Sequence, residues 1–465
     1  MEQPPASLPS AADLATLACS IGPVPRYTSY PTAPHFLPVR DDDDWRGWLG
    51  AVPEGSRFSL YIHTPFCRQM CWYCGCHTQV AKSDDTLRRF TALLIREIEL
   101  VAQYLPSGAG LSALHFGGGT PSIIGANGLQ HVAECLFRHF TPLPGAEIAI
   151  ELDPRHFDSA LLPGLAALGV NRASLGVQSL DERVQAAINR QQPFDCVERA
   201  TDLLRQAGIE SLNLDLIYGL PFQTTATVAE TVRRSLALEP DRVALFGYAH
   251  VPWMKAHQRR IDETALPDTR ARFEQEAAAA AVLCEAGMQR IGLDHFARPD
   301  DPIAVQAAAG RLHRNFQGYT TGTGEVLLGF GPSAISTLPQ GYAQNIPSVA
   351  SWRQTVQAGR LPVARMRAIS DEDRLRGAVI EQLMCNLQVD LEAMSVAAGR
   401  SAGMFAGSVA RLEPLRRCGL VEVDNNWRIT VREHGRPMLR QACAAFDAYL
   451  APATATGMQP RHAAA

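Results

Sequence analysis

SLYIHTPFCRQMCWYCGC, residues 59–76, joins a short β-rich run to a group of four closely spaced cysteines. Further β-rich runs follow it, and the stretches between them carry apolar residues three or four positions apart, as in the helical pattern of 87–105. Strands that alternate with helices predict parallel βα units. The expected strands are 59–64, 113–117, 147–152, 172–177, 211–217 and 242–248, and the further expected helices are 159–168, 195–207 and 224–238.

Six βα units predict an α/β fold built on a partial (β/α)6 barrel, with its chemistry on loops at the C-terminal ends of the strands. Two more strand-like runs, 289–293 and 326–330, flank a polar, aromatic stretch from His313 to Thr321. From about residue 370 the pattern is mostly helical and closes with a small hairpin and a helix at 433–450. We therefore expect an irregular N-terminal arm that closes over the active site (1–55), the barrel with its extension (56–365), a mostly helical, winged-helix-like C-terminal domain (366–450) and a frayed tail (451–465).

The composition is that of a globular protein with no global affinity for polyanions. The 465 residues include 43 basic and 47 acidic ones, so nothing in the net charge of −4 asks for nucleic acid or an anionic membrane. No uninterrupted apolar run reaches the roughly 18 residues of a membrane span, and the first residues lack a secretory signal. We expect a cytoplasmic protein. Only Lys82 and Lys255 are lysines; a GC-rich genome explains this bias, but arginine also clamps carboxylates and phosphates better than lysine.

The cysteine group indicates a metal site in a reducing compartment. Cys67, Cys71 and Cys74 stand in one tight loop after the first expected strand, and three thiolates can hold three corners of a cubane iron–sulfur cluster. The fourth iron then stays open to a small molecule. A structural zinc site is the alternative, with Cys76 or His77 as the fourth ligand, although such sites usually use two separated cysteine pairs.

Polar and glycine-rich residues end the next expected strands. GGGTP, residues 117–121, lets a ligand approach the backbone closely. Glu151 ends the third strand and could bond ribose hydroxyls, or it caps a helix. Gln178, Arg190 and Asp215 suit a zwitterionic ligand, unless Arg190 and Asp215 form a structural salt bridge.

With these motifs the chain resembles the oxygen-independent coproporphyrinogen III oxidases of the radical S-adenosylmethionine superfamily nearly end to end. The matching stretches are 25–32 (PRYTSYPT), 61–63 with 65–67, 75–76, 115–121 (HFGGGTP), 151–155 (ELDPR), 176–178, 189–190, 213–221 (NLDLIYGLP), 294–301 (DHFARPDD) and 313–321.

The resemblance implies oxidative decarboxylation of two propionate side chains of coproporphyrinogen III to vinyl groups, by a 5′-deoxyadenosyl radical and without oxygen. It implies one [4Fe–4S] cluster on the three cysteines and two molecules of S-adenosylmethionine. The positions that match the first molecule are Tyr61, Gly118, Glu151 and Ile335, and those that match the second are Tyr73, Gly119, Thr120, Gln178, Arg190, Asp215 and Ala249.

The resemblance also implies a monomer served by an external electron donor and acceptor. Candidate catalytic residues are Cys76, Tyr27 and Arg26, with Tyr27 and Tyr30 on an arm that closes as a lid. Because guanidinium forks match carboxylates, Arg26, Arg298 and Arg314 are candidates to bind the propionates. The role of Cys76 is open between a structural thiol, a radical quencher and a proton source.

Two other functions compete with this one. Haem chaperones resemble the same family and keep the three-cysteine loop, but they usually lack the Gly75-Cys76 extension, the 26–31 arm and the 313–321 segment. A radical enzyme of the same architecture with another substrate is the second.

Overall fold

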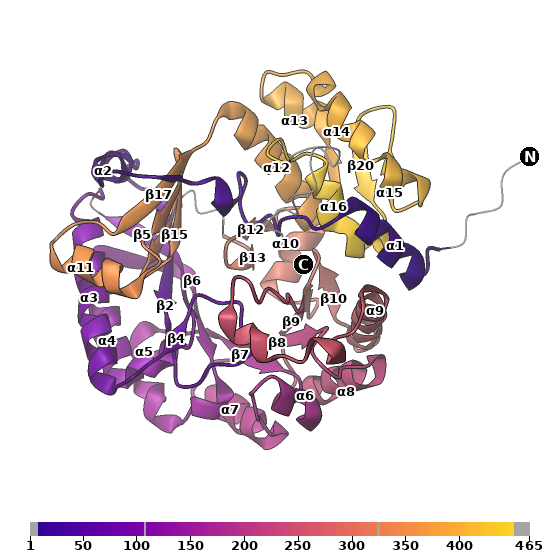
Figure 1. Ribbon diagram of the computed structural model, residues 1–465. Helices are drawn as coiled ribbons and strands as arrows, with labels where there is room; N and C mark the ends of the chain where they lie inside the picture. The colour runs from indigo at the N-terminus through magenta and orange to yellow at the C-terminus, as the bar shows by residue number, and fades with distance from the viewer. Residues whose placement is uncertain (1–7, 107, 323–325, 451–465) are drawn as a thin grey trace, which may run out of the picture.

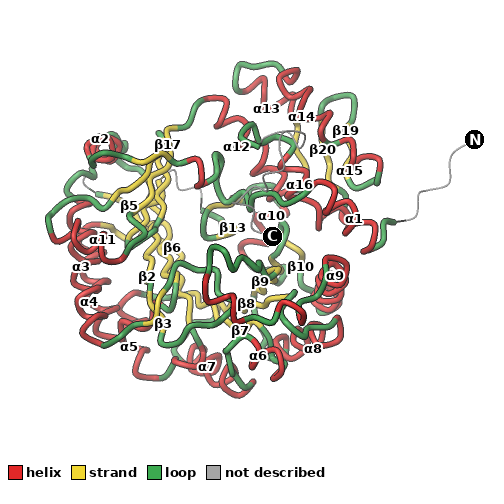
Figure 2. Tube along the Cα trace, viewed as in Figure 1, coloured by secondary structure: helices red, strands yellow, loops and turns green. Residues whose placement is uncertain are grey.

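Six parallel strands form the centre of the structure, a computed structural model that describes residues 8–106, 108–322 and 326–450. Each strand pairs with the next in chain order, as a βα barrel requires. The intervening helices cover the outer side (Figures 1 and 2), so the expected partial barrel is confirmed. The strands are β2 (Arg57–Thr64), β5 (Ala109–Gly118), β6 (Phe140–Leu152), β7 (Arg172–Gln178), β8 (Ser211–Tyr218) and β9 (Arg242–Gly247); the helices are α3 (Asp84–Ala102), α4 (Gly125–His139), α5 (Leu162–Leu168), α6 (Glu182–Ala187), α7 (Phe194–Gln206), α8 (Thr225–Leu236) and α9 (Thr269–Glu285).

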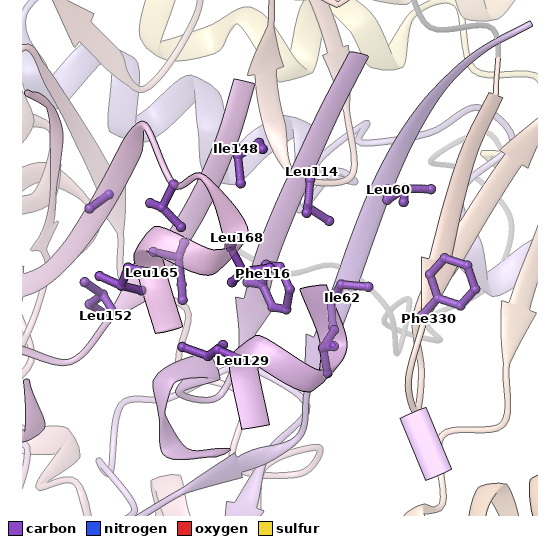
Figure 3. Packing of buried hydrophobic residues seen from close by; sticks show 14 of the residues in the cluster. Leu60, Ile62, Leu114, Phe116, Leu129, Ile148, Leu152, Leu165, Leu168 and Phe330 are labelled. Carbon is purple, nitrogen blue, oxygen red and sulfur yellow. The ribbon is translucent and has the colours of Figure 1, made fainter. Parts of the chain in front are cut away.

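The barrel is held by apolar side chains that alternate along its strands. Leu60 and Ile62 of β2 and Phe116 of β5 are at most 1% exposed, and Figure 3 shows Phe116 beside Leu129 and Leu168 from the covering helices. Each such side chain contributes roughly 1.5–3 kcal/mol by burial. Because the six strands are parallel, their C-terminal ends meet at one mouth.

The sheet continues beyond the barrel on both sides to a total of 13 strands. The run 326–330 forms a strand, as expected, and pairs parallel with the first barrel strand. The added strands on that side are β14 (Val326–Phe330), β15 (Ile335–Leu338), β16 (Gly341–Asn345), β17 (Val363–Ala368) and β1 (Leu37–Pro38); on the other side they are β11 (His295–Ala297) and β10 (Gln289–Ile291). Shorter pieces are the pair β3 (Phe66–Cys67) and β4 (Gln79–Val80), the hairpin β12 (His313–Asn315) and β13 (Gly318–Thr320), α10 (Pro302–Ala308) and α11 (Val349–Gln357).

The N-terminal arm is not irregular, which corrects the sequence-based expectation. It contains α1 (Ala11–Ile21) and α2 (Asp43–Gly50). Ser10 and Asp13 form a capping box at the start of α1. The run of four aspartates at 41–44, within this arm, leads into the first turn of α2, where carboxylates interact favourably with the positive end of the helix dipole.

The C-terminal region packs around its own apolar cluster, which also takes in Tyr27 and Tyr30 of the arm. The expected helix over 433–450 is wrong: Pro437 lies in a 3-10 turn over 433–438, and only α16 (Leu439–Ala444) follows as α-helix, because proline lacks the N–H that a longer α-helix needs. The other elements are α12 (Asp371–Asn386), β18 (Gln388–Asp390), α13 (Leu391–Ala397), α14 (Ala406–Arg411), α15 (Glu413–Arg417), β19 (Val421–Val423) and β20 (Arg428–Val431).

The three short strands form one antiparallel sheet beside these helices. The winged-helix comparison and the domain boundaries stay predictions, and the tail 451–465 lies outside the described residues. In the described part of the chain, no helix is both long and apolar enough to cross a membrane.

Candidate functional site

The cysteine loop lies at the barrel mouth, directly after β2. Cys67 belongs to β3, Cys71 is buried, and the next two cysteines are progressively more exposed. All of them are free thiols. Among the described residues, no three His, Cys, Asp or Glu side chains converge as ligands of a single metal ion do.

Hydrogen bonds to its main chain fix the loop from two directions. Asn189, in the turn before Arg190, donates its amide N–H to Met70 O at 2.9 Å. From the segment after β9, Lys255 Nζ donates to Cys76 O at 2.9 Å and Gln258 Nε2 donates to Tyr73 O at 2.9 Å. The sequence interpretation missed this second anchor. Its only signal was that Lys255 is one of two lysines.

The thiols meet polar groups suited to thiolates. The Thr78 hydroxyl lies 3.3 Å from Cys67 Sγ and the Thr120 hydroxyl 3.6 Å from it. Guanidinium N–H groups of Arg155 and Arg190 each donate to Cys71 Sγ at 3.5 Å. The Cys71 sulfur therefore has two guanidinium groups as hydrogen-bond donors.

Cys76 lies against the third cysteine of the triad. A hydrogen bond between the two thiols is the main cause that brings the pKa of Cys74 down to about 7, while the same contact raises the pKa of Cys76 well above its usual value. Cys74 is therefore the thiol of the pair that ionises first.

The glycine turn runs against the strand that leads into the cysteine loop. Gly119 N–H donates to Thr64 O and Thr120 N–H donates to Phe66 O, both at 2.8 Å. A Cβ on Gly119 would stand only 2.5 Å from Phe66 O. Gly118 has φ +112°, which side chains rarely adopt. Only glycine fits at both positions.

Tyr61 and Glu151 lie on neighbouring sides of this turn. Glu151 accepts hydrogen bonds from Gly118 N–H and His115 Nε2, both at 3.1 Å. Tyr61 Oη lies 3.1 Å from His63 Nδ1. Because His63 Nε2 must donate to the carbonyl of His77, Nδ1 accepts from Tyr61, and burial lowers the pKa of His63 to about 4, which keeps the ring neutral.

Arg190 pairs with Asp153, so the proposed salt bridge between Arg190 and Asp215 is wrong. Two of its N–H groups donate to the Asp153 carboxylate at 3.3 Å, and Arg155 donates to it at 2.6 Å. Burial alone would raise the pKa of Asp153, but the hydrogen bond from Arg155 and the charge of Arg190 bring it to about 2. Asp153 was not among the residues singled out from the sequence, although it lies two positions after Glu151.

Asp215 is held by neutral donors instead. Ser174 Oγ donates to it at 3.0 Å and Asn213 Nδ2 at 2.8 Å. Burial, followed by the nearby charge of Glu151, raises its pKa to about 6. A carboxylate without a cationic partner at the mouth is suited to bind hydroxyl or ammonium donors.

The remaining expected ligands also lie at the mouth. Gln178 ends β7 with φ +66°, and its buried Oε1 has no hydrogen-bond partner within the described ranges. Ala249 follows β9, and Ile335 begins β15. Four residues before Ile335, Gly331 packs so closely against His63 O that a Cβ would not fit there. The unpartnered Gln178 oxygen and the glycine turn at Gly118 and Gly119 suit a polar ligand bound across the strand ends.

The arm residues are not brought to the cysteine loop. Tyr27 is 4% exposed in the C-terminal apolar cluster, and its hydroxyl donates to Asp447 at 3.1 Å, so its catalytic assignment finds no support in this geometry. Arg298 lies beside Asp241, just before β9 begins, at the opposite end of the barrel. Arg26 and Arg314 line a separate cavity at the mouth.

Comparisons with known proteins agree with this architecture. Residues 61–234 match the model of the radical SAM superfamily, and residues 369–434 match the HemN C-terminal domain. A protein of Bradyrhizobium diazoefficiens named oxygen-independent coproporphyrinogen III oxidase is 49% identical over 94% of this chain and 98% of its own. One of the same name from Paracoccus denitrificans is 45% identical over 92% and 94% of the two chains. The solved structure of coproporphyrinogen III oxidase from Escherichia coli, described as a radical SAM enzyme, superposes with a TM-score of 0.87 at 38% identity and covers 91% of this chain and 98% of that one.

Proposed function

The chain belongs to the family of oxygen-independent coproporphyrinogen III oxidases, and from this premise we propose that it oxidatively decarboxylates coproporphyrinogen III to protoporphyrinogen IX. In this reaction two propionate side chains each lose a hydrogen atom, one further electron and carbon dioxide, and each becomes a vinyl group. The single observation that carries the proposal is the match over nearly the whole of both chains.

The residues present fit the two cofactors of the superfamily. Cys67, Cys71 and Cys74 would hold a [4Fe–4S] cluster, since they are free thiols with hydroxyl and guanidinium groups aimed at their sulfurs. Such a cluster would supply the single electron that cleaves S-adenosylmethionine reductively and so starts the radical chemistry.

The residues around the loop would orient S-adenosylmethionine. Glu151 and Asp215 offer carboxylate oxygens to ribose hydroxyls or an ammonium group, and Arg190 offers a cation to a carboxylate. Gln178 contributes the unpartnered amide oxygen described above. The remaining contact positions are those implied by the family, namely Tyr61, Gly118 and Ile335 for one molecule and Tyr73, Gly119, Thr120 and Ala249 for a second.

Cys76 is proposed as a functional thiol because it lies against Cys74 at the open side of the loop. Replacing it by serine is expected to leave iron and sulfide content unchanged and to lower turnover. A Cys76→Ser variant with full turnover would assign this thiol a structural role only.

The experiment that tests the main proposal is anaerobic turnover. Reconstituted protein is incubated with coproporphyrinogen III, S-adenosylmethionine and a reductant, and the expected products are protoporphyrinogen IX, methionine and 5′-deoxyadenosine. Cys71→Ala, which removes one cluster ligand, is the matched inactive control. Stable haem binding without any decarboxylated product would favour the haem chaperone, a function for which the names of the relatives give no support.

The cellular setting is part of the same proposal. A cytoplasmic monomer with an external electron donor and acceptor suits an oxygen-sensitive cluster that needs electrons one at a time. Size-exclusion chromatography of the reconstituted protein with light scattering checks the oligomeric state.

A further inference from the structure

A cavity of about 260 Å³ lies at the barrel mouth, next to the ends of β8 and β9. Tyr218 and Gly247, the last residues of these strands, form part of its wall. The rest of the wall comes mainly from the arm, the β10–β11 segment, the β12–β13 hairpin, α9 and α16. The cavity therefore sits where the barrel, the arm and the C-terminal region meet.

Five arginines line this cavity, and only two carboxylates accompany them. Glu276 is paired with Arg290, and Asp294 holds the ring of His295 through a 2.8 Å hydrogen bond. The five arginines are Arg26, Arg272, Arg290, Arg314 and Arg440. Four of the five arginines are therefore left without a carboxylate in ion-pair contact among the described residues.

The individual contacts identify which cations are free. Arg314 donates to main-chain oxygens of Arg26 and Tyr27, at 3.0 and 2.7 Å, and so has no acidic partner. Within the described residues, the guanidinium groups of Arg26, Arg272 and Arg440 make no hydrogen bond or ion pair with protein. Burial lowers the pKa of Arg440, so its charge is held at an energetic cost.

Uncompensated guanidinium groups around one cavity favour an anionic ligand, and a planar fork matches a carboxylate best. The cavity also adjoins the cofactor residues: Tyr218 lies three positions after Asp215 on β8, and His295 at the cavity wall pairs with Ala244 of β9, which in turn pairs with Asp215. A ligand held by the arginines thus lies beside the proposed reaction centre.

We propose that Arg272 and Arg440, assisted by Arg26 and Arg314, bind propionate carboxylates of the tetrapyrrole that do not react in a given turnover. This inference rests on the proposed function and adds the residues that orient its substrate. A carboxylate held by guanidinium groups is stabilised as an anion, which opposes its loss as carbon dioxide. The arginines therefore suit anchoring of the unreactive propionates, and the reacting propionate is the one left to face the cysteine loop.

The test uses anaerobically reconstituted holoprotein and coproporphyrin III, the oxidised tetrapyrrole that keeps all four propionates. Its binding is followed by fluorescence for the wild type, Arg272→Gln and Arg440→Gln. Each variant is expected to bind about tenfold more weakly, since a hydrogen bond to a charged group is lost. Arg298→Gln, the same change at the opposite end of the barrel, is the control and is expected to bind as the wild type does.

The tetramethyl ester of coproporphyrin III separates charge from shape. Its binding is expected to be equal in the wild type and both variants, because it offers no carboxylate. Equal binding of the free acid by the wild type and both variants would overturn the proposal. Iron content and thermal unfolding check that each variant is folded; if Arg440→Gln does not fold, Arg272→Gln together with the charge-preserving Arg440→Lys decides the question.

Failure of this inference and failure of the proposed function give different results. Wild-type protein that binds coproporphyrin III through these arginines but forms no protoporphyrinogen IX would refute the reaction and keep the carboxylate site. Normal turnover with unchanged binding in both variants would refute the site and keep the reaction.

Discussion

Replacing Gly119 by alanine tests whether the glycine turn and the cysteine loop form one rigid unit. The added Cβ would stand 2.5 Å from Phe66 O and would also collide with the Thr78 hydroxyl, where 3.4 Å or more is an ordinary contact. The turn therefore has to move by roughly 0.9 Å. That movement opposes the two 2.8 Å hydrogen bonds from Gly119 and Thr120 to the strand. Overpacking costs about 1–3 kcal/mol, and weakening two buried hydrogen bonds adds about 1 kcal/mol each.

The functional effect is expected to exceed the effect on stability. A displacement of about 1 Å at a reacting centre can lower a rate by about 100-fold, so Gly119→Ala is expected to release 5′-deoxyadenosine about 100-fold more slowly while it stays folded. The assay is reductive cleavage of S-adenosylmethionine by the reconstituted protein, quantified by chromatography. Gly47→Ala on α2, whose Cβ would meet nothing within 4 Å, is the control. A Gly119→Ala rate within threefold of the wild type would refute the reasoning.

Three further changes are expected to have measurable effects. Glu97→Gln is expected to destabilise the protein by about 1–3 kcal/mol, because both Glu97 oxygens accept hydrogen bonds: Oε2 from Gly331 N–H and Trp352 Nε1–H, and Oε1 from Asn345 Nδ2. An amide nitrogen in place of either oxygen leaves at least one buried donor unpaired, and an unchanged melting temperature would contradict this. The pKa of Asp215 is about 6 in the folded protein, above its unfolded value, so the protonated carboxyl stabilises the fold below about pH 4 and this stabilisation is lost as the pH rises through 6. The free energy of unfolding of Asp215→Asn, relative to that of the wild type, is therefore expected to rise by up to about 3 kcal/mol between pH 4 and pH 7. Melting curves with no such pH dependence would disprove the shift. Gln258→Leu removes the donor to Tyr73 O, so a chelator is expected to extract iron several-fold faster than from the wild type, and equal extraction rates would show that this anchor does not hold the loop.

The barrel and its mouth could be predicted from sequence because their signals are local. Alternating apolar residues in 59–64 and the period of 87–105 report directly which face of each element is buried. The cysteine spacing and the glycine turn then fall at strand ends, and parallel pairing brings strand ends together without further information.

Features that depend on contacts across long stretches of chain were missed. The acidic start of α2 falls in the arm expected to be irregular, but Asp42 accepts a hydrogen bond from Leu361 N–H at 2.9 Å, more than 300 residues away. The sequence motifs offer Arg190 two acidic partners, Asp153 and Asp215. Only the register of the strands determines that Arg190 forms its ion pair with Asp153, while Ser174 and Asn213 donate hydrogen bonds to Asp215. No local pattern carries that choice.

The arginine-lined cavity depends most strongly on contacts between distant parts of the chain, so it is the feature that the sequence reveals least. Arg272 and Arg440 come from α9 and α16, and in the sequence each looks like any other arginine of an arginine-rich chain, whereas only the family resemblance points to Arg26 of the arm. What distinguishes them is that they share one cavity without an ion-pair contact to a carboxylate among the described residues. This arrangement forms only when three separate segments meet. Like charges oppose that meeting, so apolar packing of the arm against the C-terminal cluster has to outweigh their repulsion. A site that is costly to assemble and is still kept charged is therefore better explained by an anionic ligand than by a contribution to folding.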